Sequence, residues 1–80
     1  MKKITIKSLM LFLKLSNDAI NWNGYPLVDV SPEERGNLTD LKKLGLVETF
    51  IEEGFDWCKF TALGVTFAKE NGYDLSIYYK

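Results

Sequence analysis

The sequence predicts an α+β fold in which a helix leads into a two-stranded antiparallel hairpin and the hairpin leads into another helix. Leucines at helical spacing run into a glycine that favours a helix end; these residues are Leu38, Leu41, Leu44 and Gly45. Residues 47–51 and 56–60 favour strands, and they flank a short acidic turn at residues 52–54. Thr61 follows the second strand and is a suitable N-cap for the next helix.

A further, apolar helix is expected near the amino end, from Thr5 or Ser8 to Ser16 or beyond, because either hydroxyl can cap it. The stripe predicted to be buried consists of Ile6, Leu9, Phe12 and Leu13. Other apolar side chains of this segment fall on other faces, and a helix that is apolar nearly all round needs cover on more than one side. The carboxyl-terminal tail or a second copy of the chain is expected to supply that cover.

Residues 17–30 are the least regular part of the sequence. Strong turn signals at Asn23-Gly24 and Tyr25-Pro26 predict a loop. Residues 27–30 suit a short strand, and residues 18–22 have room for one or two helical turns.

The next helix is expected to begin at residues 31–34, which read SPEE. Ser31 is a good N-cap, proline fits the first helical position, and Glu34 stands three residues after Ser31, as a capping box requires. The helix is predicted to continue to Leu44. Gly36 inside it costs about 1 kcal/mol relative to alanine, which indicates either a close contact or a weak helix.

The carboxyl-terminal residues 73–80 alternate between apolar and polar side chains, which is the periodicity of a strand. The whole chain, residues 1–80, is predicted to form one domain with this strand-like tail packed on the amino-terminal helix or added as an edge strand. Because symmetric pairs are the commonest soluble oligomers, the uncovered helix and the tail together favour a homodimer.

The composition excludes several classes of protein. The 80 residues are 46% hydrophobic and 26% charged, as expected of one small globular domain. A single cysteine, Cys58, cannot form an internal disulfide, and its place in a predicted strand favours a buried structural thiol. The apolar run at residues 9–15 is too short to span a membrane and is not followed by a signal-peptide cleavage site. We therefore expect a cytoplasmic protein.

The residues that usually carry catalysis are scarce in this chain. It has no histidine and one cysteine, which excludes a zinc site of the usual type and the commonest general base. It has no phosphate-binding loop, dinucleotide-binding motif or nucleophile motif. The carboxylate pairs Glu33-Glu34 and Glu52-Glu53 are expected to be solvated. We predict no catalytic residue, no metal, no cofactor and no enzymatic activity.

The central segment resembles the pattern L-x-x-L-x-x-x-G-L-V … W … L-T-x-x-G of small winged-helix proteins. In this chain the pattern stands as Leu38, Leu41, Gly45-Leu46-Val47, Trp57, Phe60-Thr61 and Gly64. The resemblance implies three helices with a two- or three-stranded β wing, and a small transcriptional regulator that binds double-stranded DNA. Residues 17–30 depart from the family pattern, because a full helix-turn-helix needs another helix there.

The DNA-binding hypothesis places the contacts on the helix that precedes the hairpin, opposite its buried leucines. The side chains expected to meet DNA are Arg35, Thr39, Lys42 and Lys43. Charge opposes this hypothesis, because residues 31–60 carry four positive and seven negative side chains. The acidic turn, Glu52-Glu53, would lie close to phosphates and be repelled.

The alternative hypothesis is a protein-interaction module with an acidic wing and exposed aromatic rings. Its expected contact residues are Phe50, Glu52, Glu53, Phe55 and Trp57. A small acidic domain of this kind is similar to accessory proteins of phages and mobile elements, which often bind and inhibit a host protein. The same rings could equally have a purely structural role, in which they pack on the domain's own core.

Overall fold

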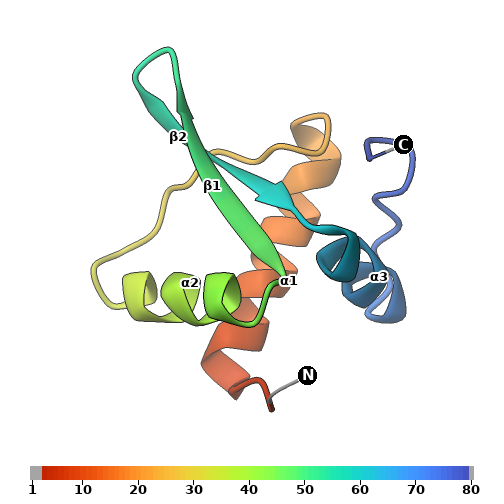
Figure 1. The fold of residues 1–80 in the computed structure, drawn as a ribbon, viewed down its shortest axis with the longest axis horizontal. Coiled ribbons are helices and arrows are strands. Elements are labelled where there is room, and N and C mark those ends of the chain that lie inside the picture. The colour runs from red at the N-terminus through yellow and green to blue at the C-terminus, as the bar shows by residue number, and fades with distance from the viewer. Residues whose placement is uncertain (1–2, 80) are drawn as a thin grey trace.

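A computed structural model describes residues 3–79 and contains three helices and a two-stranded antiparallel sheet (Figure 1). The elements are α1 (Ile6–Asn21), α2 (Glu34–Lys43), β1 (Val47–Glu52), β2 (Phe55–Phe60) and α3 (Ala62–Glu70). The α+β prediction is confirmed, and the arrangement is compatible with a winged helix whose wing has two strands. Residues 1, 2 and 80 of the predicted domain lie outside the described residues.

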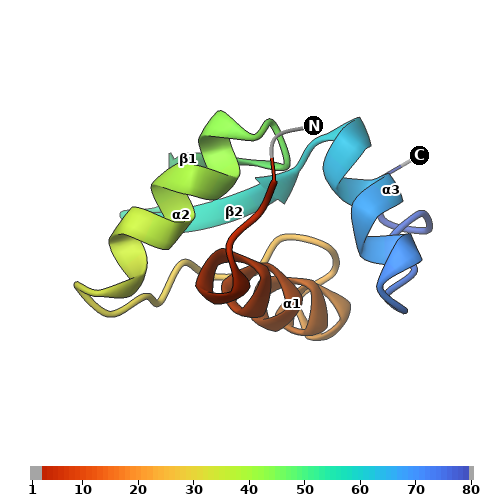
Figure 2. The ribbon, with the colours of Figure 1, turned by 90° about the horizontal axis from the view of Figure 1, so that it is seen from below.

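The helices surround the base of the hairpin, and its tip projects beyond them (Figure 1). Figure 2 shows α1 beneath the sheet, with α2 and α3 on either side. Phe12 lies at the centre of the core, where its ring centroid is 5.4 Å from that of Phe60 and 5.2 Å from that of Phe67. The largest fully buried aliphatic side chains around it are Leu15, Leu41, Leu46 and Leu75. No helix within residues 3–79 is long and apolar enough to cross a membrane.

Helix α1 begins as expected, because the Thr5 hydroxyl accepts a hydrogen bond from the Ser8 backbone N–H at 3.2 Å. The stripe predicted to be buried is wrong in part: Phe12 is fully buried, Leu9 and Leu13 are half-buried, and Ile6 is 78% exposed. The buried face consists of Ser8, Leu11, Phe12, Leu15, Ser16 and Ala19. Ser8, Ser16 and Ala19 of this face are not strongly hydrophobic, so hydrophobic periodicity does not predict their burial. The buried Ser16 hydroxyl is satisfied within the helix, by the Phe12 carbonyl at 2.8 Å.

Helix α2 begins at Glu34, so Pro32 is not its first helical residue, but the two hydrogen bonds of the expected capping box are formed just before it. The Ser31 hydroxyl accepts from the Glu34 backbone N–H at 3.3 Å, and the Glu34 carboxylate accepts from the Ser31 N–H at 3.1 Å. Leu38 and Leu41 are buried, as predicted, and Leu44 is half-buried. Gly36 is exposed, and an added Cβ would meet nothing within 4 Å. The glycine therefore weakens the helix and serves no close contact.

The hairpin forms over the predicted segments and extends one residue further at its tip. Phe50 pairs with Trp57, and Glu52 pairs with Phe55 across a two-residue turn. The turn residues Glu53 and Gly54 have φ values of 54° and 80°. Positive φ at both central positions is typical of a type I′ turn, which matches the right-handed twist of paired strands.

The loop between α1 and α2 contains no separate helix. Residues 18–21 extend α1, so the additional helix of a full helix-turn-helix is not formed there. Leu27 forms an isolated bridge to Trp57, and the Val28 N–H donates to the Asp56 carbonyl at 2.9 Å. The Cys58 N–H donates to the Pro26 carbonyl at 2.8 Å. The loop therefore covers the outer edge of β2.

The strand predicted for the carboxyl-terminal tail is not formed; residues 76–78 make a turn, and Lys80 lies outside the described residues. The tail instead inserts one fully buried side chain, Leu75, into the core. The Tyr78 hydroxyl donates to the Ile20 carbonyl at 3.2 Å at the end of α1. Strand periodicity was misleading here because side-chain anchoring, and not backbone pairing, fixes the tail.

Deleting residues 73–80 is expected to lower the free energy of unfolding substantially, because Leu75 alone should account for roughly 2–5 kcal/mol if its site is left empty. Denaturant titration of the full and shortened chains measures the loss. Equal stability of the two chains would contradict this account of the tail. The homodimer stays a prediction, which light scattering on the intact chain can test; Ile6 and Met10 of α1 are exposed in the single chain.

Candidate functional site

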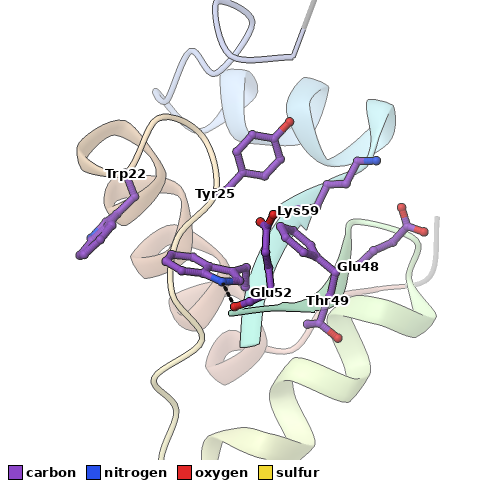
Figure 3. Close-up of a pocket in the computed structure, with 8 residues that line it drawn as sticks. Trp22, Tyr25, Glu48, Thr49, Glu52 and Lys59 are labelled. Atoms are coloured by element: carbon purple, nitrogen blue, oxygen red, sulfur yellow. Dashed lines mark hydrogen bonds between the residues drawn. The ribbon is translucent and has the colours of Figure 1, made fainter. Parts of the chain in front are cut away.

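An aromatic hollow of about 690 Å³ opens on one face of the hairpin, beside the loop that follows α1 (Figure 3). The residues that line it are Trp22, Tyr25, Glu48, Thr49, Phe50, Glu52, Trp57 and Lys59. Five of these side chains, Glu48, Phe50, Glu52, Trp57 and Lys59, share one face of the hairpin, because residues two apart in a strand point to the same face. Thr49 belongs to the other face of β1 and meets the hollow from its side. Trp22 lies at the end of α1, and Tyr25 follows the turn at Asn23-Gly24, which brings the chain back against the hairpin.

The rings of the hollow contact one another in edge-on or tilted pairs. The centroid of Tyr25 lies 6.0 Å from that of Phe50, and the centroid of Trp22 lies 6.1 Å from that of Trp57. The Trp57 indole N–H donates to the Glu52 carbonyl at 3.1 Å, the hydrogen bond drawn in Figure 3. These contacts fix the orientation of the rings, so the hollow is formed before any ligand arrives.

Tyr79 ties the hollow to the core. Its hydroxyl accepts a hydrogen bond from the Phe60 N–H at 3.0 Å and donates one to the Gly24 carbonyl. Its ring centroid lies 5.2 Å from that of Tyr25. The tail residue thus holds the loop that carries Tyr25 against the end of β2.

Three charged side chains, two acidic and one basic, line the hollow. Glu48 and Glu52 lie on its rim, and Lys59, opposite Glu48 in the strand register, supplies the one positive charge among the lining residues. Figure 3 shows Glu48 and Lys59 at the end of the hollow away from Trp22. The site therefore combines an apolar floor with a rim of net negative charge.

The residues of the protein-interaction hypothesis are partly brought together. Phe50, Glu52 and Trp57 line the hollow. Phe55 is 57% exposed with its ring 6.5 Å from that of Trp57, and Glu53 is exposed in the turn. Sequence reasoning missed Trp22 and Tyr25. The signal that could have found them is the pair of aromatic residues flanking Asn23-Gly24.

The residues of the DNA-binding hypothesis are all exposed on α2. Arg35, Thr39 and Lys42 line a second depression of about 400 Å³, and Lys43 does not take part in it. Asp29 and Asp56 line the same depression. Asp40 of α2 adds a negative charge to this helix and accepts a hydrogen bond from the buried Ser8 hydroxyl at 3.2 Å.

Two groups that titrate at alkaline pH, the fully buried Cys58 and the half-buried Tyr79, belong to the elements around the hollow. Burial raises the pKa of the Cys58 thiol from its ordinary value of 9.0 to about 12. Burial likewise raises the pKa of the Tyr79 hydroxyl from 10.0 to about 12, although the Phe60 N–H partly opposes the shift. Cys58 is fully buried, as expected, and its thiol is held in the unreactive neutral form.

The free energy of unfolding is expected to fall between about pH 9 and pH 12. Both groups have a higher pKa in the folded state than in the unfolded state, so their stabilisation is complete below the unfolded values and is lost as the pH rises through the folded ones. Denaturant titrations at intervals across this range measure the effect. Tyr79→Phe should reduce the fall in the free energy of unfolding above pH 10. If this variant lost stability with pH as steeply as the natural chain, the assignment of that fall to Tyr79 would be contradicted.

No model of a known protein family, no characterised protein and no solved structure matches the chain. Within residues 3–79, no group of three or more acidic or cysteine side chains is placed to hold a metal ion.

Proposed function

We propose that this protein is a non-enzymatic binding module that acts by holding an apolar side chain of a partner protein in the aromatic hollow. The observation that carries the proposal is the presence of two packed pairs of rings, Trp22 with Trp57 and Tyr25 with Phe50, around one opening. Aromatic residues are enriched at protein interfaces, and pockets that receive an anchor side chain concentrate the binding energy.

A protein partner fits the hollow better than a small molecule does. Small-ligand sites use a few convergent polar groups to orient the ligand. Here the Trp57 indole N–H is already bonded to the chain's own Glu52 carbonyl, and the charged residues stand on the rim. An apolar floor with a polar rim is the anatomy of a protein–protein contact.

Selection from a phage-displayed random-peptide library on the intact protein tests this proposal. We expect peptides with a common apolar or aromatic position, and we expect them to bind Trp22→Ala at least tenfold more weakly. Trp22 is half exposed at the end of α1, so this variant should keep the fold. Leu63→Ala, on an exposed position of α3 outside the hollow, is the matched control.

Two results would contradict the proposal. One is the absence of any peptide enriched on the intact protein. The other is a set of enriched peptides that bind the Trp22→Ala variant as tightly as they bind the intact protein and the Leu63→Ala control. Circular dichroism of each variant confirms that the fold is retained.

We propose DNA binding through α2 as a second candidate function, supported by the exposed basic side chains Arg35, Lys42 and Lys43. The carboxylates Asp29 and Asp56 beside the first two weaken this candidate, because non-specific affinity comes from neutralised phosphates. If this candidate is right, random duplex DNA should bind the protein at low salt. Lys42→Ala should then make the affinity less dependent on salt, by the amount that corresponds to about one phosphate contact. Undetectable binding at micromolar DNA would remove this candidate.

A further inference from the structure

The two edges of the hairpin are unequal. The outer edge of β2 is covered by the loop, through hydrogen bonds between Asp56 and Val28 and between Cys58 and Pro26. The outer edge of β1 has no such cover, because within residues 3–79 no strand other than β2 pairs with it. A six-residue edge of strand-favouring sequence is thus left open beside the hollow.

The strand register identifies the free backbone groups of this edge. In a hairpin with a two-residue turn, the pair that flanks the turn and every second pair beyond it exchange hydrogen bonds. These pairs are Glu52 with Phe55, Phe50 with Trp57, and Glu48 with Lys59. The N–H and C=O groups of Thr49 and Ile51 therefore point away from β2. Ile51 is 76% exposed, so the edge is open to solvent near the tip.

Charge defines what this edge can accept. Residues 47–56 carry four acidic side chains and no basic one; these are Glu48, Glu52, Glu53 and Asp56. We propose that the hollow and the open edge of β1 form one docking site for an extended, basic segment of a partner protein, which adds to the hairpin as a third strand. This inference rests on the proposed function and adds to it the conformation and charge of the partner.

The spacing of side chains in the added strand follows from the pleat. On the face that carries the hollow, β1 presents Glu48, Phe50 and Glu52 at alternate positions. Side chains directly opposite one another on paired strands interact, and opposite charges there are favourable. We therefore expect five consecutive residues of the partner in which the first and fifth are basic, the third is apolar and the other two are of any type. The apolar side chain would be directed to the rings. Main-chain hydrogen bonds to Thr49 and Ile51 supply the rest, as in other cases of strand addition.

A second copy of this chain is a poorer occupant. Pairing two β1 edges would bring Glu48 and Glu52 of both copies onto one sheet, and like charges close together on paired strands are destabilising. A basic strand meets the same edge with complementary charge. Its binding should weaken as salt is raised, because exposed charge pairs are screened.

The experiment uses the peptides selected on the intact protein, together with a blocked test peptide of sequence TKTLTKT. Affinities are measured by fluorescence, since both tryptophans of the chain line the hollow. The double variant Glu48→Lys/Glu52→Lys, at two exposed positions, should bind the basic peptide about tenfold more weakly and should prefer TETLTET. N-methylation of alternate peptide amides should cost about tenfold in one register and little in the other, because only one set of amides faces β1.

Thr49→Pro removes one outward N–H of β1, and Thr49→Ala, which keeps that N–H, is its control. Strand addition is supported if the peptides bind more weakly to Thr49→Pro but not to Thr49→Ala. If the proline variant does not fold, the N-methylated peptides test strand addition instead. Selected peptides that need Trp22 but tolerate N-methylation and charge reversal would overturn this inference and leave the proposed function standing. A selection without enriched peptides would overturn both. A dimer of the intact chain that Thr49→Pro abolishes would show that a second copy occupies the edge.

Discussion

Gly64→Ala is expected to destabilise the protein by about 3 kcal/mol or more, which corresponds to a fall in melting temperature of roughly 12 °C or more for a domain of this size. Gly64 lies in the first turn of α3, against the backbone at Leu46. An added Cβ would collide with the Leu46 carbonyl group. Backbone atoms cannot swing aside as the end of a flexible side chain can, so the helix or the strand entry has to move.

Other contacts hold the Leu46 carbonyl group in place, so we expect the structure to relieve the collision with the added Cβ only slightly. The Thr61 N–H donates to the Leu46 carbonyl at 3.1 Å. The Thr61 hydroxyl lies 3.2 Å from the same oxygen, although its nearer acceptor is the Gly45 carbonyl. That hydroxyl also accepts from the Gly64 N–H at 3.0 Å as the cap of α3. The junction thus joins the start of β1, the end of β2 and the start of α3 around one oxygen.

Gly36→Ala is the matched control, because Gly36 is also a helical glycine but an added Cβ there meets nothing. This variant should be more stable than the natural chain by about 1 kcal/mol. Thermal unfolding of the two variants side by side measures both effects. A Gly64→Ala protein as stable as the natural one would contradict the described packing of α3.

Leu41→Ala is expected to lower the free energy of unfolding by roughly 2–5 kcal/mol, because Leu41 is completely buried between α2 and the rest of the core. Leu44→Ala on the same helix should cost less, since Leu44 is only half-buried. Denaturant titration gives both values. A loss at Leu41 below about 1 kcal/mol would mean that α2 presents another face to the core.

Local sequence signals predicted the elements of the fold well where each signal acts on its own neighbours. The capping box at Ser31 and Glu34, the acidic turn before Gly54 and the cap at Thr61 are all formed. The prediction of a strand in the tail failed for the opposite reason. The alternating pattern of the tail is a local signal, whereas Leu75 and Tyr79 are held by contacts with residues far away in the sequence.

The candidate site was predicted in part, for a related reason. Phe50 and Trp57 could be placed opposite each other because a two-residue turn sets the register. Trp22 and Tyr25 could not be placed, because turn residues show that the chain reverses but not where the loop comes to rest. Its position depends on the bridge from Leu27 to Trp57 and on the Tyr79 hydroxyl, which is more than 50 residues away.

The most direct test of the central claim, that the aromatic hollow holds a side chain of a partner protein, is the dissociation constant of a library-selected peptide for the intact protein and for Trp57→Ser. Trp57 contacts both Trp22 and Phe55 and lines the hollow, so its loss removes the floor of the site. We expect at least a tenfold weaker affinity, which is about 1.4 kcal/mol. An unchanged dissociation constant in a Trp57→Ser protein that keeps its fold would contradict the claim.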